Sequence, residues 1–279
     1  MATPVPVSSP TDPRLADYAA VREPRVLRDR GVFLGEGRRV LEALLTTPRF
    51  AIRSLLVSKT RAQWLQASEL VIPEDVPVYV SEDASLASIT GYRFHQGCLA
   101  AVDVPAQPSL EAWMAGPGRA PGPLVLLDGV TNPDNVGAIF RTARAFGAAG
   151  VLLTSRACSP LYRKAVRTSM GSTLKLPWWQ GGEGGALVGA VQASGREVWA
   201  LTLGVGAQPL GTRPPPAQGA FRPALLVGEE GYGLAPDVEE RADRRVFIPI
   251  DRDVDSLNVG AAAAIALYTL ASCVPPEMS

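Results

Sequence analysis

Three polar turns, each directly after a short apolar run, carry most of the residues in this sequence that could do chemistry. The turns are "TNPDNVG" after "LVLLD", "GEEGYGLAP" after "ALLV" and "DRDVDSLNVG" after "FIPI". Continuous apolar runs of this length are typical of buried parallel strands. Because α/β proteins bind ligands at the carboxyl edge of such a sheet, the sequence predicts that the turns hold a small polar ligand. Each turn taken singly is also an ordinary capping sequence.

Arg141 follows the first of these turns by a few residues. Apolar residues at helical spacing between Val136 and Phe146 predict a helix after the turn, with Arg141 in its first turns. A guanidinium at the ligand edge of a sheet offers a permanent, forked positive charge, which suits an anionic group. The alternative is an arginine on the helix surface without a chemical role.

The sequence lacks the patterns of several common catalytic classes. No G-x-G-x-x-G follows a first strand and no G-x-x-x-x-G-K-[ST] occurs, which argues against a dinucleotide-binding turn and a P-loop. His95 is the only histidine, so neither the usual Ser-His-Asp triad nor a histidine-based metal cluster is supported. We expect His95 to be a surface or strand-end residue. Cys98, Cys158 and Cys273 lie far apart, which favours free thiols, a reducing compartment and no metal site.

The composition is that of a folded protein with a substantial core. Of the 279 residues, 47% are hydrophobic and 19% are charged, and the formal net charge is +0, which excludes a disordered or strongly basic chain. The longest apolar run, "LNVGAAAAIALYTLA", is shorter than the roughly 20 residues that span a bilayer. The opening "MATPVPVSSP" does not resemble a signal peptide. We therefore expect a cytoplasmic protein that does not enter a membrane.

The apolar runs and the glycine- and proline-rich stretches divide the chain into four predicted segments. Residues 1–21 are rich in proline and small residues and are predicted to be a flexible tail. Residues 22–104 alternate short strand and helix patterns, which indicates a small α/β domain. Residues 105–123 are crowded with proline and glycine and are predicted to be a linker. Residues 124–279 predict a second α/β domain with a mostly parallel sheet.

Charge is distributed unevenly along this neutral chain. Ten basic and four acidic residues lie between Val21 and Arg61, and seven basic residues with no acidic ones lie between Arg141 and Lys175. Local basic stretches of this kind favour attraction to a polyanion, with solvated helix faces as the alternative.

Taken together, the three turns resemble one family. "NPDNVGAIFRTARAFGA", "LLVGEEGYGL" and "IPIDRDVDSLNVGAAAAIALY" are similar, in this order, to the three motifs of the SpoU/TrmH RNA ribose 2′-O-methyltransferases of the SPOUT superfamily. The resemblance extends from Leu124 to Ala271. It implies an α/β SPOUT-type fold with a C-terminal deep trefoil knot, S-adenosyl-L-methionine as cofactor, tRNA or rRNA as substrate, and a homodimer with active sites at the subunit interface. The stretch "GVFLGEGRRVLEALL" is similar to the L30e-like substrate-binding domain that often precedes this catalytic domain.

The resemblance also implies site residues. Catalytic or polar positions fall on Asn135, Arg141, Glu230, Ser256 and Asn258. Contacts to S-adenosylmethionine fall on Leu203, Gly228, Ile248 and Leu257. The family commonly has a serine where this chain has Gly260, which removes a hydroxyl near the start of the last helix.

Each implied residue can be given a chemical role. A ribose 2′-hydroxyl is a poor nucleophile at neutral pH, so we expect Arg141 to stabilise the 2′-oxyanion and the adjacent phosphate. Asn135 would orient the arginine or the ribose, and Glu230 would anchor the loop or the arginine. Ser256 and Asn258 would cap the last helix and bind the cofactor or the nucleotide.

Two other functions stay open at this point. The chain could be an RNA-binding or ribosome-assembly protein that has lost catalysis, or a methyltransferase of small molecules. If RNA is the substrate, we expect the basic residues of the first domain to hold it, namely Arg22, Arg25, Arg28, Arg38 and Arg39.

Overall fold

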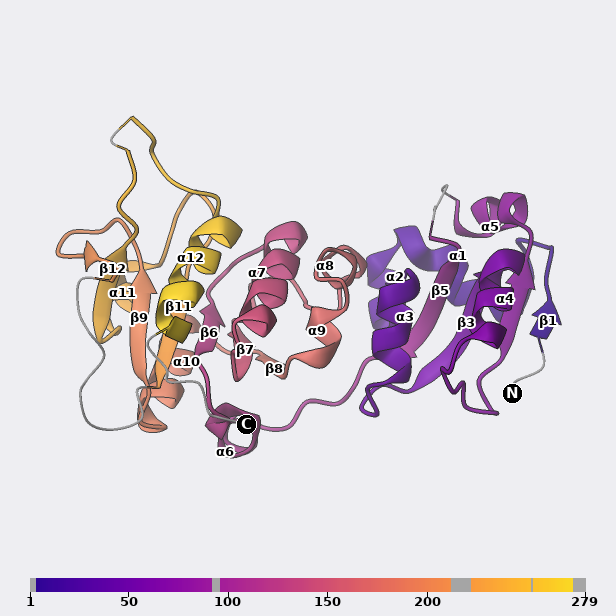
Figure 1. The fold of residues 1–279 in the computed structure, drawn as a ribbon, viewed down its shortest axis with the longest axis horizontal. Helices are drawn as coiled ribbons and strands as arrows, with labels where there is room; N and C mark the ends of the chain where they lie inside the picture. Colours follow the sequence, from indigo (N-terminus) through magenta and orange to yellow (C-terminus); the bar gives the residue numbers. More distant parts are fainter. Residues whose placement is uncertain (1–3, 92–95, 212–221, 252, 273–279) are drawn as a thin grey trace. The chain divides into compact units, whose positions relative to one another are not determined.

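The computed structural model describes residues 4–91, 96–211, 222–251 and 253–272. Contacts within the chain divide it into two compact units, which are described separately below (Figure 1). The first unit comprises Met1–Ala106 and Leu161–Lys175, and the second comprises Gln107–Pro160 and Leu176–Ser279.

The first unit is built on a five-stranded sheet in the order β1-β4-β3-β5-β2. Strands β1, β4 and β3 are parallel, whereas β5 runs antiparallel to β3 and β2. Most residues of the inner strands are buried, because helices pack against them. The strands are β1 (Pro4–Pro6), β2 (Val32–Glu36), β3 (Ile52–Ser58), β4 (Val78–Ser81) and β5 (Cys98–Asp103). The helices are η1 (Pro13–Leu15), α1 (Ala16–Ala19), η2 (Ala20–Arg22), α2 (Pro24–Asp29), α3 (Arg38–Leu45), α4 (Lys59–Ala67), α5 (Asp83–Thr90), α8 (Arg163–Thr168) and α9 (Ser172–Lys175).

The prediction of a flexible tail over residues 1–21 is wrong for the described residues from 4 onwards. Strand β1 pairs with β4 at the edge of the sheet, where its prolines remove no hydrogen bond from an inner ladder. Leu15 and Tyr18 are fully buried, and the Tyr18 hydroxyl is 2.7 Å from the Ser54 hydroxyl. The proline-rich composition conceals these two core residues, which tie the segment to the sheet.

Helix α8 joins the first unit although it is distant in sequence. Glu36, at the end of β2, is only 3% exposed, and its carboxylate forms an ion pair with Arg163 of α8. Arg167 lies 3.9 Å from the same carboxylate. A buried carboxylate is costly without a cationic partner, so this pairing explains why Leu161–Lys175 packs with the first unit.

The second unit contains a seven-stranded sheet in the order β10-β12-β9-β11-β6-β7-β8, in which all neighbouring strands are parallel. This confirms the predicted α/β class with a mostly parallel sheet. Val227 of β11 is level with Leu127 of β6, so the turns that follow these strands start at the same edge. The strands are β6 (Leu124–Leu127), β7 (Gly150–Leu153), β8 (Trp178–Gln180), β9 (Glu197–Leu201), β10 (Gln208–Pro209), β11 (Pro223–Val227) and β12 (Arg244–Phe247).

Helices cover both faces of this sheet. Helix α7 (Pro133–Ala145) packs against α12 (Val259–Ser272), and α12 also contacts β11 (Figure 1). The opposite face packs against the remaining helices through a core that includes Leu126, Leu187 and Leu226. Those helices are α6 (Leu110–Ala115), η3 (Pro117–Arg119), α10 (Gly184–Ala193) and α11 (Pro236–Glu240).

The predicted linker at residues 105–123 is instead largely a packed part of the second unit. Trp113 of α6 is 3% exposed and belongs to the core. Arg196 is equally buried, and its guanidinium donates hydrogen bonds to the backbone carbonyls of Gly118, Ala120 and Gly122. Burial lowers the pKa of Arg196 to about 10. Proline and glycine therefore shape a fixed turn here, held by one aromatic and one arginine side chain.

Candidate functional site

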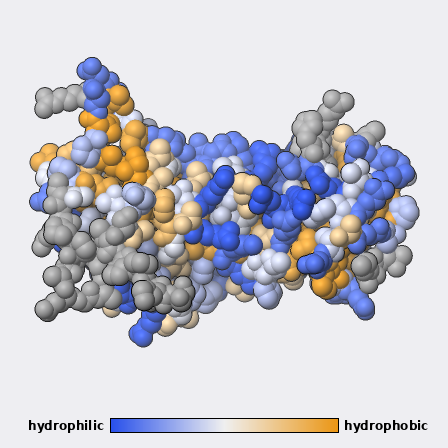
Figure 2. Space-filling view, viewed as in Figure 1, coloured by the Kyte–Doolittle hydropathy of each residue, from blue (hydrophilic) through white to orange (hydrophobic). Residues whose placement is uncertain are grey.

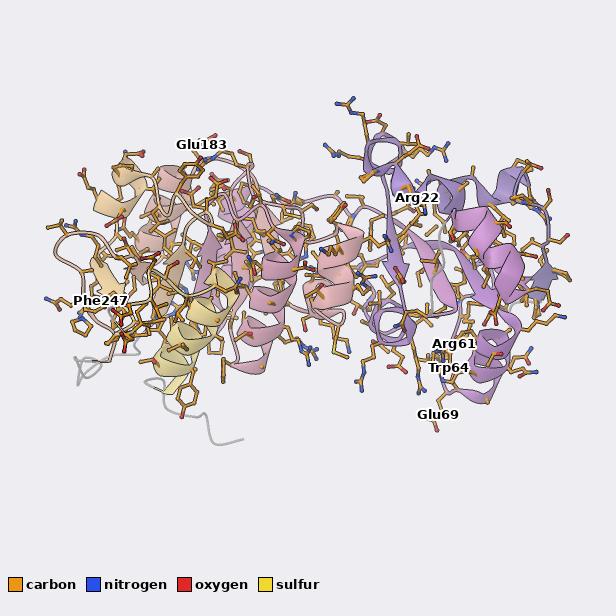
Figure 3. All side chains as sticks on the ribbon, turned by 90° about the horizontal axis from the view of Figure 1, so that it is seen from above. Arg22, Arg61, Trp64, Glu69, Glu183 and Phe247 are labelled. Atoms are coloured by element: carbon orange, nitrogen blue, oxygen red, sulfur yellow. The ribbon has the colours of Figure 1, made fainter. Side chains whose placement is uncertain are left out.

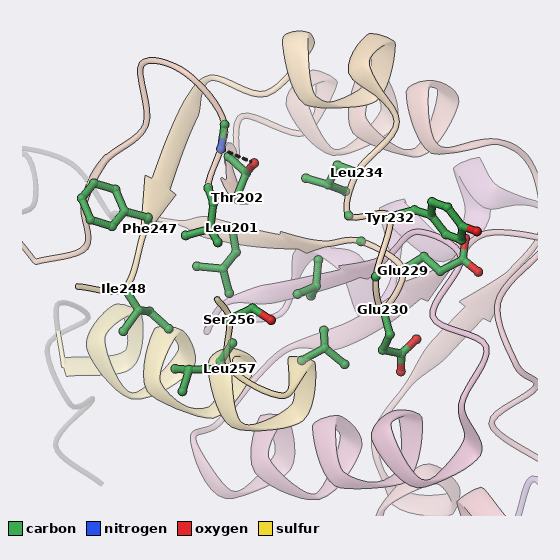
Figure 4. A pocket seen from close by; sticks show the side chains of 18 of the residues that line it. Leu201, Thr202, Glu229, Glu230, Tyr232, Leu234, Phe247, Ile248, Ser256 and Leu257 are labelled. Atoms are coloured by element: carbon green, nitrogen blue, oxygen red, sulfur yellow. Dashed lines mark hydrogen bonds between the residues drawn. The ribbon is translucent and has the colours of Figure 1, made fainter. Parts of the chain in front are cut away.

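A cavity of about 560 Å³ lies at the carboxyl ends of β9, β11 and β12 (Figure 4). Its size falls within the range of about 300–1,000 Å³ that is usual for small-molecule sites. The lining comes from residues 201–204, 227–234 and 256–259, together with Glu239, Phe247, Ile248, Ile250 and Ala262. The second and third predicted turns therefore meet at one edge of the sheet, as the strand pattern indicates.

All four residues predicted to contact the cofactor line this cavity. They are Leu203, Gly228, Ile248 and Leu257. Leu203 is 64% exposed. Val205 and Val254, which lie close in sequence to the lining segments, are also exposed. Figure 2 shows hydrophobic side chains gathered at this end of the second unit. The cavity thus offers apolar surface to a ligand from three separate segments.

A tight hairpin at residues 229–233 brings the second turn to the cavity. The backbone N–H groups of Glu229 and Gly233 each donate to the carbonyl of the other, at 3.0 and 2.9 Å. Gly233 has a φ of +73°, which a side chain would disfavour. At Gly228 a Cβ would lie 2.4 Å from the Gly233 backbone, so no other residue fits without a backbone shift.

Asn135 connects the three turns by hydrogen bonds. It is 7% exposed, and its Nδ2 donates to Oε1 of Glu230 at 2.5 Å. Its Oδ1 accepts a hydrogen bond from Nδ2 of Asn258 at 3.0 Å. Asn258 in turn accepts from the backbone N–H of Gly260 at 2.9 Å and caps the start of α12. One residue from each turn therefore forms a continuous polar chain beside the cavity, with Glu230 and Asn258 in its lining.

Arg141 and Ser256 are less enclosed than Asn135 and Glu230. Arg141 is exposed on α7, six positions after Asn135, so the two side chains leave the helix about 120° apart. Arg141 does not line the cavity, and it forms no hydrogen bond or ion pair with any described residue. Ser256 lines the cavity and is exposed, and it too has no hydrogen bond to the described residues.

The predicted site residues do not include every residue of the cavity, and the missing ones include Thr202, Tyr232 and Glu239. Oγ1 of Thr202 lies 3.1 Å from Oε2 of Glu239 and accepts a hydrogen bond from the backbone N–H of Gly204 at 2.9 Å, drawn in Figure 4. Thr202 directly follows β9, so its place at the end of a strand could have identified it. Tyr232 is 90% exposed at the tip of the hairpin. Tyr232 lies within the second predicted turn, whereas Glu239, which lies on α11, has no comparable signal.

Other chemistry finds little support in the described parts of the chain. They contain no group of three or more His, Cys, Asp or Glu residues that could hold a metal ion. Burial raises the pKa of both Cys98 and Cys158 to about 11, which leaves little reactive thiolate at neutral pH. Among the same residues, no helix is both long and apolar enough to cross a membrane. His95 and Cys273 lie outside the described residues.

Comparison with known proteins is consistent with this geometry. The model of the SpoU rRNA Methylase family matches residues 122–268. An uncharacterised tRNA/rRNA methyltransferase of Mycobacterium tuberculosis is 32% identical over 269 residues, which cover 94% of this chain and 90% of that protein. The 23S rRNA (guanosine(2553)-2′-O)-methyltransferase of Bacillus subtilis is 25% identical, over 95% of this chain and 98% of its own length. The AdoMet-bound rRNA methyltransferase of Sinorhizobium meliloti superposes with a TM-score of 0.78 and 25% identity, over 96% and 97% of the two chains.

Proposed function

Since the chain belongs to the SpoU rRNA Methylase family, we propose that it uses S-adenosylmethionine to methylate a ribose 2′-hydroxyl of tRNA or rRNA. The observation that carries this proposal is the polar chain from Glu230 through Asn135 to Asn258, which joins the three family motifs beside a ligand-sized cavity. The name of the Bacillus subtilis relative supports the 2′-hydroxyl as the acceptor. An RNA substrate in turn favours a cytoplasmic location.

The cavity lining suits S-adenosylmethionine. Leu203, Ile248 and Leu257 supply apolar surface for an adenosine group. The glycine hairpin exposes backbone to a ligand, and the carboxylates of Glu230 and Glu239 lie in a lining that would receive a positively charged molecule. When bound, S-adenosylmethionine supplies a methyl group activated by its sulfonium.

The side chains of the protein bind and orient the reactants and stabilise charge. Glu230 fixes Asn135, and Asn135 fixes Asn258, so the Asn258 amide in the cavity lining is held before a ligand binds. Arg141 stabilises the negative charge that develops on the 2′-oxygen as its proton leaves. A guanidinium is a permanent cation, so we propose that it acts by charge and not as a base. Ser256 is placed to bind the cofactor or the nucleotide.

The position of Arg141 supports a homodimer with shared active sites. Because Arg141 points away from the cavity side of α7, it would act on an RNA that a second copy of the chain helps to hold. Helix α12 leaves Ile265 and Tyr268 exposed by 43% and 62%, and the ring of Tyr268 packs on Phe146 beside α7. Apolar residues on this face favour burial against another chain. A C-terminal trefoil knot also belongs to this proposal, because the family motifs imply it.

The first unit would hold the RNA. We propose that it is an L30e-like substrate-binding domain, on the strength of its motif. We propose residues 124–279 as the catalytic domain, except for Leu161–Lys175, which pack with the first unit. Helices α2 and α3 present exposed arginines, including Arg25, Arg28, Arg38 and Arg39. Contacts of such residues with phosphates would add salt-dependent affinity without specifying the sequence.

Two measurements test the proposed function together. Calorimetry should show binding of S-adenosylmethionine to the full chain, and mapping of 2′-O-methylated nucleotides should find a position that is modified only in cells that make the protein. Returning the wild-type gene to cells that lack it should restore that modification, whereas a gene that encodes the Arg141→Ala variant should not. Binding of RNA without any affinity for S-adenosylmethionine would instead identify a catalytically inactive RNA-binding protein.

A further inference from the structure

The first unit contains an arginine–tryptophan cluster that the proposed catalytic site does not use. The guanidinium carbons of Arg38 and Arg61 lie 4.7 and 5.9 Å from the centroid of the Trp64 ring. Arg38 begins α3, whereas Arg61 and Trp64 belong to α4, so two helices form the cluster. Figure 3 shows Arg61 and Trp64 next to one another. We call these three residues the Trp64 cluster.

Exposure distinguishes Trp64 from other aromatic rings that an arginine covers. Tyr79, Phe50 and Trp199 each have a guanidinium within 6 Å of the ring centroid, and they are 8%, 6% and 7% exposed. Those contacts lie over rings that already belong to the interior. Trp64 is only partly buried, so this residue, unlike the other three, keeps substantial surface that a ligand can reach.

The charge around Trp64 is positive. Arg61 donates from Nε to the backbone carbonyl of Gln96 at 3.0 Å, which orients the guanidinium without neutralising it. Arg38 pairs with Glu42 at 2.9 Å, but Arg38 is exposed and Glu42 is only half-buried, and ion pairs so open to solvent are weak. Arg39 is exposed and has no ion pair within the described chain. Helix α4 contains no acidic residue.

We propose that the Trp64 cluster binds an unpaired nucleotide of the RNA substrate. The base stacks on the accessible part of the Trp64 ring, and the adjoining phosphates pair with Arg38 and Arg61. Aromatic rings and guanidinium planes are the surfaces on which proteins stack unpaired RNA bases. A base inside a duplex has no free face, so the cluster discriminates in favour of loops and single strands. This inference rests on the proposed function, because it requires an RNA substrate.

The test measures RNA binding by the full-length protein over a range of potassium chloride concentrations. The probes are a fluorescent single-stranded RNA of mixed sequence and a fully paired RNA duplex of the same length. Trp64→Leu retains an apolar side chain but removes the ring, and Trp64→Phe retains a ring. Arg61→Gln removes one charge. Arg14→Gln is the matched control, because Arg14 also lies over an aromatic ring, but that ring belongs to buried Tyr79.

Stacking and charge predict different results. Trp64→Leu should weaken single-strand binding about tenfold at every salt concentration, whereas Trp64→Phe should stay within about threefold of the wild type. Arg61→Gln should reduce the slope of log affinity against log salt by about 0.7, the value for one phosphate contact on a single strand. Duplex binding should not change in Trp64→Leu, and Arg14→Gln should match the wild type with both probes.

Two outcomes would overturn the inference. One is unchanged single-strand affinity in folded Trp64→Leu, and the other is an equal loss for the duplex. If Trp64→Leu does not fold, the test is ultraviolet crosslinking of the wild-type protein to the single strand. The crosslinked peptide should contain Trp64. Crosslinks found only in other peptides would refute the proposal. Calorimetry with S-adenosylmethionine tests the proposed function separately from this inference. A wild-type protein that binds cofactor and RNA while Trp64→Leu is unaffected keeps the proposed function and loses only this inference.

Discussion

Asn135 and Arg141 belong to the same motif and the same helix, but their surroundings differ. Asn135 is buried, and its amide forms hydrogen bonds with Glu230 and Asn258 of the same chain. Arg141 is exposed, and it contacts no polar group in the described part of the chain. One half of the site is thus complete before any ligand arrives. We propose that the other half forms only when the RNA substrate or a second chain approaches Arg141, and substitutions should separate these two roles.

Replacing Arg141 with alanine should have the largest effect on catalysis. We expect turnover to fall by about two to three orders of magnitude, because the charge that Arg141 stabilises exists only as the transition state forms. The affinity for S-adenosylmethionine and the melting temperature should not change, because the side chain is exposed and outside the cavity. Single-turnover methyl transfer, calorimetry and thermal unfolding measure the three quantities. Arg144→Ala, an exposed arginine in the same helix, is the control.

Mixed dimers sharpen this prediction. When differently tagged Arg141→Ala and Asn135→Ala chains are produced together, a shared site predicts that one of the two sites in each mixed dimer is intact, giving about half of the wild-type activity. Mixed dimers as inactive as either parent would show that both residues act within one chain. Near-normal turnover by Arg141→Ala alone would remove the arginine from the mechanism.

Replacing Asn135 with alanine should have a smaller effect on rate and a broader effect on the molecule. We expect a loss of about tenfold to a hundredfold in turnover, because Glu230 and Asn258 are no longer held in place. Unlike Arg141→Ala, this change should also lower the free energy of unfolding by about 1–3 kcal/mol, because buried Asn135 loses its two hydrogen bonds, to Glu230 and from Asn258.

The neighbouring Asn132 provides the control for that experiment. Asn132 caps α7 by accepting a hydrogen bond from the backbone N–H of Asp134 at 2.9 Å, but it does not contact Glu230. Asn132→Ala should therefore lower stability by about 1 kcal/mol without the loss of turnover. An equal loss of turnover in the two variants would contradict the proposed role of the polar chain.

Gly260→Ser should have the smallest effect. A Cβ at this position would lie 3.1 Å from Oδ1 of Asn258 and 3.4 Å from Cβ of Ala138, so its neighbours would move by a few tenths of an ångström. Because Asn258 already caps α12, the helix starts correctly without a serine hydroxyl. We expect turnover to change by less than about threefold, which corresponds to well under 1 kcal/mol. A gain of tenfold or more would show that the chain lacks a catalytic hydroxyl.

The sequence was most informative where a strand ends in a turn. Apolar runs ending at Leu127, Val227 and Phe247 are local patterns, and the parallel pairing that brings their ends to one edge follows from the alternation of strands and helices. The turns could therefore be placed together before the structure was known. The hydrogen bonds among Asn135, Glu230 and Asn258 required coordinates, because side-chain direction is set by packing.

The errors arose where a segment finds its partner far away in the chain. Tyr18 lies beneath a sheet whose Ser54 is 36 positions later, and Glu36 pairs with Arg163, 127 positions later. Composition within a short window cannot indicate such partners, so residues 4–21 resembled a tail. The sequence does not indicate the core position of Trp113 for a related reason. In residues 105–123, prolines and glycines outnumber this single aromatic residue, which packs in the core of the second unit.

The ion pair between Glu36 and Arg163 also governs the order in which the chain can fold as it is synthesised. The strands of the first sheet are all available once Asp103 has been translated, but α8 appears only 60 residues later. By then β6, α7 and β7 have already emerged. The first unit therefore cannot be completed until the first elements of the second unit have been translated, so the two units cannot fold strictly one after the other.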